Sequence, residues 1–452
     1  MRAIIIGAGK VGFSIAQLLS LEEHDVIVIE ENEERAIVVE ELLDVQVING
    51  NGASWKVLES VGVRHTDLVI AVTEIDELNM IACLLAKQYG AKTTVARVRN
   101  INYVETPHFS PEALLGIDLI INPERVTAYE IAKIVKNPEA LECDYYADGK
   151  IQLLAILITE DSPVAGLKLM DLNTAKYVIV SIVREHNMIV PNGNNEILVG
   201  DQLYIIAKAD EMSDVLKVFN IHRRKVDNLT ILGAGRTGCY LAEIIEKEHL
   251  PINVKVIEKN AKKAREASAR LKNSLIINAD GSDLDILKAE NIEQTDLFVA
   301  VTNDDKINLL SSLIAKNLGV KKTIAKVKRT DIMPLMQQIG IDIVLSPRII
   351  TAGAILKYVR RGDIVSVTVL GEEKAEMLEL YAQPNSIAVG KSLKKIKFPT
   401  GSVIGAIVRD DEVIIPNGDS VINPFDHLLV FTLPKSIHKV EKLFINGGKS
   451  WW

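Results

Sequence analysis

Two glycine-rich segments stand half a chain apart and share the spacing with which a backbone receives a phosphate. Residues 7–12 read GAGKVG, and residues 233–238 read GAGRTG. The first glycine permits a sharp strand-to-helix turn, the second lets a pyrophosphate approach, and the third lets the helix pack closely. The N–H groups and dipole of the following helix then face the anion. Each copy follows an apolar run and opens a helical pattern, so we expect two nucleotide sites.

An acidic residue follows each glycine segment at the distance of a second strand's end. Glu30 lies 18 residues beyond Gly12, and Glu258 lies 20 residues beyond Gly238. An acid here bonds both ribose hydroxyls and repels a 2′-phosphate. An exposed strand-end acid without a ligand is the alternative. The pattern favours NAD or an adenine nucleotide over NADP.

A loop after the third expected strand is also repeated. Residues 49–52 read NGNG, and residues 278–281 read NADG. In a nucleotide site this loop borders the adenine, where Asn51 and Asp280 could accept a hydrogen bond from the exocyclic amine, next to Gly52 and Gly281. An ordinary loop is an equally good interpretation.

The fourth and fifth expected strands carry polar residues at their carboxyl ends. Thr73 and Thr302 close the fourth strand, where the crevice of a parallel sheet lies beside the phosphates. Helix capping is the alternative for these threonines and for the polar residues that follow them, Asp76, Asn79, Asp305 and Asn308.

Basic residues alternate at the end of the fifth strand in both copies. Arg97 and Arg99 in the first copy correspond to Lys326 and Lys328 in the second. They could meet phosphates of the same or a neighbouring subunit, or form salt bridges. Arginine and lysine are not equivalent in bidentate bonding, so the two sites could bind different nucleotides.

These residues need parallel strands with crossover helices to position them. The apolar runs at residues 3–6, 25–29, 46–48, 68–72, 94–98 and 119–121 are continuous, as in strands covered on both faces. Helical patterns lie between them, at residues 11–19, 33–43, 56–61 and 77–87. Six such strands make a complete Rossmann-type α/β sheet.

A smaller α+β domain follows each Rossmann-type unit. Strands are expected at residues 151–158, 178–185, 188–190 and 201–207, with helices at 166–172 and 211–219. The whole plan then repeats. The expected domains are Rossmann at 1–135, small α+β at 136–220, Rossmann at 227–358 and small α+β at 359–446.

Composition excludes several functional classes. The 452 residues carry a formal charge of −8 and only 5% aromatic residues, which argues against a nucleic-acid binder. Three unevenly placed cysteines fit a reduced, cytoplasmic setting. The chain enters a strand at once and has no membrane-length apolar run, so a membrane role would come through a partner.

Sets of residues typical of catalysis or of metal binding do not occur in the sequence. The eight histidines show no metal-ligand spacing, and there is no Gly-x-Ser-x-Gly, Walker loop or kinase set. We expect no catalytic residues and no metal site, hence a protein that is not an enzyme.

In combination, these motifs resemble a known family. The order GAGxVG, strand-end acid, NGNGA, VTxxDxxN and ARVR is similar to the nucleotide-binding half of an RCK domain, a regulator of potassium conductance. The small domain resembles the RCK C-terminal subdomain. Two copies in one chain resemble the Trk-system potassium-uptake peripheral subunits. In the last small domain GD becomes NPFD at residues 423–426, which we expect to lengthen a turn.

The resemblance implies a cytoplasmic gating ring of several chains, peripheral on the inner face of the membrane and docked on a TrkH-type potassium transporter. It implies binding of NAD(H) and of ATP or ADP. The first site would be lined by Gly7, Gly9, Lys10, Val11, Gly12, Glu30, Asn51, Gly52, Thr73 and Arg97 or Arg99, and the second by Gly233, Gly235, Arg236, Thr237, Gly238, Glu258, Asp280, Gly281, Thr302 and Lys326.

Two other functions stay open at this point. A nicotinamide-dependent oxidoreductase is compatible with the glycine segments, although it needs an acid or base that is not evident. A nucleotide-sensing regulator of another cation channel or antiporter is compatible with all the motifs. The last Rossmann helices, at residues 126–135 and 350–358, are expected either on oligomer surfaces or buried within the chain.

Overall fold

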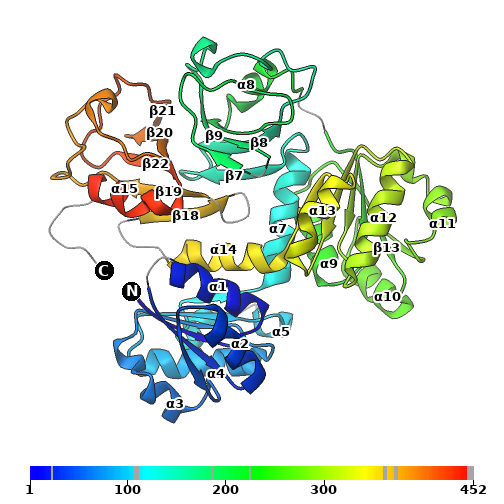
Figure 1. The fold of residues 1–452 in the computed structure, drawn as a ribbon. Helices are drawn as coiled ribbons and strands as arrows, with labels where there is room; N and C mark the ends of the chain where they lie inside the picture. The colour runs from blue at the N-terminus through cyan, green and yellow to red at the C-terminus, as the bar shows by residue number, and fades with distance from the viewer. Residues whose placement is uncertain are drawn as a thin grey trace. The chain divides into compact units, whose positions relative to one another are not determined.

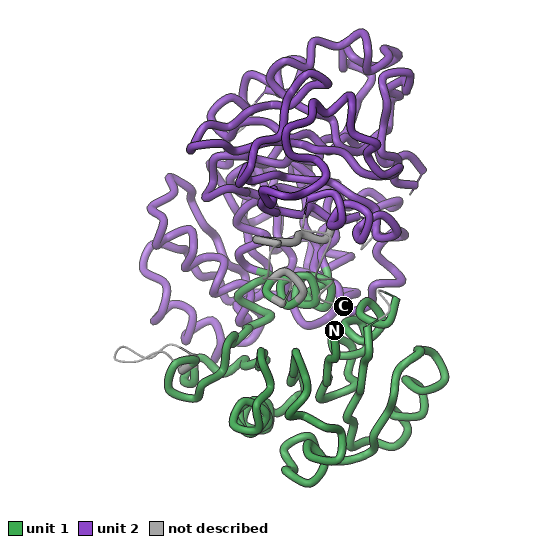
Figure 2. The backbone as a smooth tube through the Cα atoms, turned by 90° about the vertical axis from the view of Figure 1, so that its left-hand side faces the viewer, with its two compact units in different colours: residues 1–127, 346–359, 450–452 green, residues 128–345, 360–449 purple. Residues whose placement is uncertain are grey.

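The computed structural model describes residues 1–21, 24–104, 111–185, 187–222, 225–359, 364–370 and 375–444 (Figure 1). The chain forms two compact units (Figure 2). Among the described residues, the first contains 1–127 with 346–359, and the second contains 128–345 with 364–444. Each unit contains one of the expected Rossmann-type sheets.

The first sheet is parallel and six-stranded, in the order β3-β2-β1-β4-β5-β6. Apolar side chains fill both of its faces, which explains the continuous apolar runs. The strands are β1 (Arg2–Ile6), β2 (Asp25–Glu30), β3 (Gln46–Asn49), β4 (Leu68–Ala71), β5 (Thr93–Arg97) and β6 (Leu119–Ile121). The helices are α1 (Lys10–Leu21), α2 (Glu33–Leu42), α3 (Trp55–Ser60), α4 (Asp76–Gln88), α5 (Ile101–Val104), α6 (Pro111–Leu115) and α7 (Pro123–Lys136).

The second Rossmann-type sheet repeats this order as β14-β13-β12-β15-β16-β17, again parallel. Its strands are β12 (Asn228–Leu232), β13 (Asn253–Glu258), β14 (Leu275–Asn278), β15 (Leu297–Ala300), β16 (Lys322–Lys326) and β17 (Ile343–Leu345). Its helices are α9 (Arg236–Lys247), α10 (Ala261–Arg270), α11 (Leu284–Ala289), α12 (Asp305–Asn317) and α13 (Met333–Gln338), and α14 (Pro347–Val359) follows its last strand. The predicted fold class is confirmed.

The two small domains are antiparallel five-stranded sheets with matching orders, β10-β9-β11-β8-β7 and β18-β19-β22-β20-β21. The first contains β7 (Glu142–Tyr146), β8 (Ile151–Leu157), β9 (Tyr177–Arg184), β10 (Asn187–Ile189), β11 (Gln202–Lys208) and helix α8 (Met212–Val218). The second contains β18 (Ile364–Leu370), β19 (Ala375–Tyr381), β20 (Ser402–Arg409), β21 (Glu412–Ile414), β22 (His427–Thr432) and helix α15 (Ile437–Phe444). A shared apolar cluster joins one face of each sheet.

Helix α14 packs on the first Rossmann-type sheet, although it follows the last strand of the second. Ala352 and Ile355 are fully buried in the same core cluster as α1. The Tyr358 hydroxyl donates to the backbone oxygen of Asp118 at 2.7 Å, and Arg348 hydrogen-bonds Ser14 at 2.5 Å. Of the two expectations for this helix, burial within the chain is the one observed. The compact units therefore do not coincide with a division of the sequence into consecutive domains.

Two expectations for the small domains were wrong. Residues 166–172 form no α-helix, because only a three-residue 3-10 turn, Leu169–Asp171, is present. The turn at residues 423–426 is not lengthened. Arg184 pairs with Asp201 in the first small domain, and Arg409 pairs with Asp426 at the equivalent place in the second.

The turn keeps its length because Phe425 takes the place of Gly200. Gly200 has a φ of +89°, and Phe425 adopts nearly the same backbone at +66°. Leu198 and Asn423 each donate an N–H to the aspartate three residues on. The Arg–Asp fork therefore holds the same turn in both copies, at a cost in backbone strain for the phenylalanine.

Candidate nucleotide sites

The glycine segments lie where the strand order of each Rossmann-type sheet reverses. β1 and β4 are parallel neighbours, but the chain continues from β1 to β2 on one side of the pair and from β4 to β5 on the other, which opens a crevice at their carboxyl ends. Gly7 follows β1 with a φ of +99°, and a Cβ there would be 2.9 Å from Thr73 Cγ2. Gly233 likewise faces Thr302, at 3.2 Å. The structure thus brings the glycine loops and the predicted threonines together.

The other glycines of the loop differ in what surrounds them. A Cβ on Gly12 would be 1.9 Å from the Gly7 carbonyl oxygen, so close helix packing requires the glycine. A Cβ on Gly9 would meet no described atom within 4 Å. Gly238 and Gly235 repeat the pattern. The second glycine of each loop therefore faces open space, as approach of a phosphate requires.

The first turns of α1 and α9 supply N–H groups and a positive charge. Lys10 and Arg236 are exposed at the two helix starts. Val11 packs against the core and Thr237 is buried, so their side chains point away from the crevice. What they offer a ligand is their backbone N–H groups, because the first N–H groups of a helix lack intrahelical partners.

The strand-end acids fasten the glycine loops to the sheet. Glu30 accepts the N–H of Ala8 at 2.5 Å and that of Asn32 at 2.9 Å. Glu258 accepts the N–H of Ala234 and of Asn260 in the same way, at 2.9 and 2.8 Å. Each carboxylate thus lies between the phosphate loop and the position of the ribose in Rossmann sites.

The adenine-side loops have different charges in the two copies. Asn51 Oδ1 accepts the N–H of Ala53 at 2.8 Å, and Gly52 beside it is buried. Asp280, followed by buried Gly281, pairs with Lys259 at 2.6 Å.

A second partner, Ser282, also donates to the Asp280 carboxylate. The hydrogen bonds from Lys259 and Ser282 lower the pKa of Asp280 to about 2, so the carboxylate stays ionised. Part of its capacity to accept hydrogen bonds is already used by these two residues. Sequence reasoning missed Lys259. An alignment of the two halves could have identified Lys259, because it corresponds to Glu31 and the charge is therefore reversed at this position.

Two buried asparagines hold the carboxyl ends of the fourth and fifth strands together. Asn79 Oδ1 accepts the N–H and hydroxyl of Thr73, and Asn79 Nδ2 donates to the carbonyls of Thr73 and Arg97 at 3.0 and 2.8 Å. Asn308 makes the same four contacts with Thr302 and Lys326. Sequence analysis placed these asparagines beside the phosphates or at a cap, but they position the residues on either side.

The aspartates of the same motif bind backbone as well. Asp76 accepts the N–H groups of Arg99 and Asn100 at 2.8 and 2.7 Å. Asp305 accepts those of Lys328 and Arg329. The motif thereby fixes the segment that carries the alternating basic residues.

Arg97 and Arg99 have different surroundings. Arg97 donates to the Val72 carbonyl at 3.3 Å, beside the crevice, and its buried Nε has no partner among the described residues. Burial lowers the pKa of this guanidinium, and the charge of Arg99 adds to the effect. Arg99 instead pairs with Glu124 of α7 at 2.9 Å. Arg97 is therefore the better placed of the two for a phosphate.

The corresponding lysines of the second copy also differ. Lys326 is 7% exposed at the end of β16. Lys328 donates to the Asn303 carbonyl at 2.6 Å. At the end of the fifth strand, the second copy therefore has the point charge of a lysine where the first has the planar fork of Arg97.

The part of the chain that the structure describes has neither a cluster of metal ligands nor a helix able to cross a membrane. It contains no group of three or more His, Cys, Asp and Glu side chains arranged to hold a metal ion. None of its helices combines the length and the apolarity needed to cross a membrane.

Solved structures share this fold. The channel titled "GsuK channel bound to NAD" aligns over 98% of this chain and 78% of its own, with a TM-score of 0.63 and 16% identity. The GsuK RCK domain aligns over 98% of this chain and 94% of its own, with a TM-score of 0.62 and 16% identity. At this identity the likeness concerns the fold.

Sequence comparisons identify the family. The TrkA-N domain model matches residues 3–123 and 229–347, and the TrkA-C domain model matches residues 153–220 and 377–445. The Trk system potassium uptake protein TrkA homolog 2 of Methanosarcina mazei is 40% identical, with 98% of this chain and all of the relative covered. The TrkA protein of Halomonas elongata is 34% identical, with 99% of each covered. This chain therefore belongs to the TrkA family of Trk system potassium uptake proteins.

Proposed function

We propose that this chain is a non-enzymatic regulatory subunit that binds NAD(H) and ATP or ADP and thereby controls a TrkH-type potassium transporter in the membrane. The observation that carries the proposal is the pair of glycine loops. The second glycine of each loop faces open space, and a strand-end carboxylate accepts a hydrogen bond from the backbone of each loop. The proposed position is the cytoplasmic face of the membrane, in a ring of several copies.

The proposed ligand contacts follow the crevices. In the first site the phosphates would meet the α1 N-terminus, Lys10, Thr73 and Arg97, and the ribose would meet Glu30. In the second they would meet the α9 N-terminus, Arg236, Thr302 and Lys326, with Glu258 at the ribose and Asp280 at the adenine. Two features support a different preference in each site: the buried Arg97 Nε, for which the described residues provide no partner, and the Lys259–Asp280 pair.

Control of a transporter requires that a nucleotide bind two conformations with different affinity. To move an equilibrium from 1:99 to 99:1 takes about 5.5 kcal/mol of differential binding. A ring with several sites distributes this energy, so about 1 kcal/mol per site would be enough.

Calorimetric titration of the whole chain with NAD, NADH, ATP and ADP, each alone, tests the proposal. We expect micromolar binding of at least one, with different heats or stoichiometries for ATP and ADP. Absence of binding by all four would contradict it. Steady NADH oxidation with simple carbonyl compounds would favour the oxidoreductase instead.

A further inference from the structure

Helix α2 of the first Rossmann-type sheet exposes apolar side chains that its counterpart in the second sheet does not have. Ile37, Val38 and Leu42 are 48%, 47% and 65% exposed, and Leu21 at the end of α1 is 75% exposed. Ser20 next to Leu21 hydrogen-bonds the backbone of Asp44, just beyond α2, so the ends of both helices lie together (Figure 1). We call these four residues the α2 patch.

The internal repeat supplies a matched comparison. Asn32 and Asn260 cap α2 and α10, and buried positions such as Val39 and Ala267 correspond. In this register Ile37, Val38 and Leu42 become Arg265, Glu266 and Arg270. Helices α1 and α9 align from their glycine loops, and there Leu21 becomes Lys247. The same backbone thus folds with charged residues at all four positions. Folding does not require the α2 patch.

The charge around the patch is also reversed. Helix α2 carries four glutamates and one arginine, a formal charge of −3, whereas α10 carries four basic residues and one glutamate, a formal charge of +3. The glutamates Glu33, Glu34, Glu40 and Glu41 are all exposed. The α2 patch is therefore an apolar centre with an acidic rim.

This combination selects a class of partner. An acidic rim is repelled by anionic lipid head groups, which excludes the bilayer surface itself. The cytoplasmic loops of membrane proteins carry an excess of lysine and arginine, which complements the rim. A second copy that presented its basic helix α10 would fit less well, because α10 contains no large apolar side chain to meet the apolar centre of the patch.

Other apolar residues are exposed at equivalent positions in both repeats, and the contrast with the α2 patch supports a membrane partner rather than a second copy. Ile81 on α4 and Leu310 on α12 occupy equivalent positions, and both are 49% exposed. Contacts used alike by both Rossmann-type sheets, such as those of a ring, would retain such residues. The α2 patch has no such counterpart in the second sheet, where the equivalent positions are charged, so we expect its partner to contact the first sheet.

We infer that the α2 patch docks on the basic cytoplasmic surface of the membrane transporter. The inference rests on the proposed function, since it names the surface through which this chain would reach that partner. It predicts that binding depends on both the apolar centre and the acidic rim, and that it weakens as ionic strength rises.

The test replaces the patch by the residues of the second repeat, as Leu21→Lys, Ile37→Arg, Val38→Glu and Leu42→Arg together. Phosphatidylcholine vesicles that contain the potassium-transporting membrane subunit of the same organism are floated with the full-length chain. We expect the wild type to float and the variant to lose at least about tenfold in affinity, with unchanged nucleotide binding and molecular mass. The matched control is Leu275→Lys with Leu284→Lys, two exposed leucines of the second sheet, which should float like the wild type.

Each other outcome is distinct. A wild type that does not float with the membrane subunit contradicts the proposed function. A variant that floats as well as the wild type overturns the docking surface alone. A variant of lower molecular mass assigns the patch to a second copy, and flotation with phosphatidylglycerol vesicles that lack the subunit assigns it to lipid. Either result overturns the inference.

Discussion

The glycines of each loop divide between folding and binding. Positions 12 and 238 must be glycine, because a Cβ there would lie about 2 Å from a backbone carbonyl oxygen. Gly9 and Gly235 face open space. Neither Gly9 nor Gly235 has a positive φ, so alanine is compatible with the backbone at both positions. Fold and affinity can therefore be tested separately within one loop.

Gly9→Ala should leave the free energy of unfolding within about 0.5 kcal/mol of the wild type, because the new methyl group touches no protein atom. The same methyl group would occupy the space of a pyrophosphate, so affinity for the ligand of the first site should fall at least about tenfold. Urea unfolding and calorimetry measure the two effects. Gly235→Ala is the equivalent change in the second site and assigns each nucleotide to its crevice.

Gly12→Ala serves as the contrasting variant. Its Cβ would collide with backbone, so the variant should lose stability as well as affinity. If Gly9→Ala binds every nucleotide as the wild type does, the first glycine loop is not a phosphate site.

The sequence predicted which residues lie at the end of a single strand. It did not predict the side-chain contacts that join the ends of two neighbouring strands. Glu30 and Thr73 lie where the motif order placed them. The contacts of Asn79 with both Thr73 and Arg97 could not be read from spacing, because they require the register of β4 and β5. Phe425 was missed for a different reason, since its φ of +66° is atypical of phenylalanine.

At the scale of elements, helix periodicity indicates an apolar face but not the sheet that covers it. Helix α14 has apolar residues around most of its circumference, and its sequence position suggested the second sheet, yet Ala352 and Ile355 are buried with the first. The Rossmann strands were predictable because both of their faces are apolar. Strand β7 was not predicted, since Glu142–Tyr146 is short, contains two acids and has none of the β-branched residues typical of strands.

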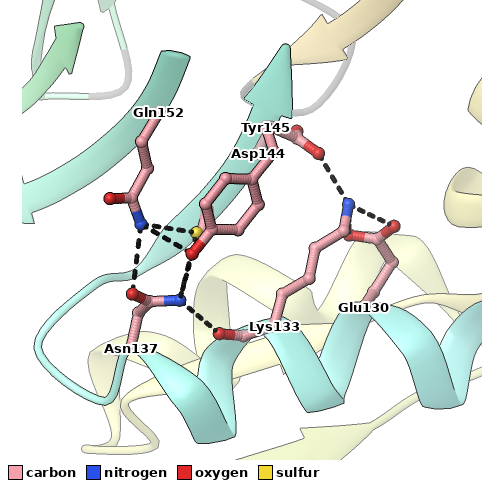
Figure 3. A network of polar contacts seen from close by, with 7 residues as sticks. Glu130, Lys133, Asn137, Asp144, Tyr145 and Gln152 are labelled. Atoms are coloured by element: carbon pink, nitrogen blue, oxygen red, sulfur yellow. Dashed lines mark hydrogen bonds and ion pairs between the residues drawn. The ribbon is translucent and has the colours of Figure 1, made fainter. Parts of the chain in front are cut away.

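A polar network at β7 fixes the end of α7 to the first small domain (Figure 3). Lys133 pairs with Glu130 at 2.8 Å and with Asp144 at 2.6 Å. Asn137 and Gln152 hydrogen-bond each other at 3.1 Å and both contact Tyr145. The junction is therefore held by polar groups.

Glu142, two residues before Asp144, makes this junction sensitive to pH. Burial raises its pKa to about 7, nearby Asp144 and Glu130 add to the shift, and the Tyr204 hydroxyl at 2.6 Å and Lys133 oppose it. An unfolded glutamate titrates near about 4.3. Between these values the folded chain binds more protons than the unfolded chain, so this group's contribution to stability falls as pH rises to about 7.

Glu142→Gln should abolish this contribution while keeping an acceptor for Tyr204. We expect the variant to match the wild type near pH 4.5 and to exceed it by about 1–3 kcal/mol at pH 8. Urea unfolding across that range measures the difference, with exposed Glu34→Gln as the control. A constant difference between pH 4.5 and pH 8 would show that Glu142 does not titrate in this way.

At the scale of the whole molecule, the chain is a duplicated module whose halves have diverged at the surface. Both Rossmann-type sheets keep their strand order and their glycine loops, and both small domains keep the Arg–Asp fork. The adenine-side loops and the charges of α2 and α10 differ. Cores shared by the two halves, with surfaces that differ, agree with the proposals that the two sites bind different ligands and that one surface reaches a membrane partner.

The most direct test of the regulatory function is potassium flux. The membrane subunit of the same organism is reconstituted in vesicles, and flux is measured with and without this chain while ATP, ADP, NAD and NADH are added separately. The account predicts that nucleotides change the flux only when the chain is present, and that Gly9→Ala or Gly235→Ala removes the response to a particular nucleotide. Flux that is the same with every nucleotide, with or without the chain, would contradict a nucleotide-controlled regulatory subunit.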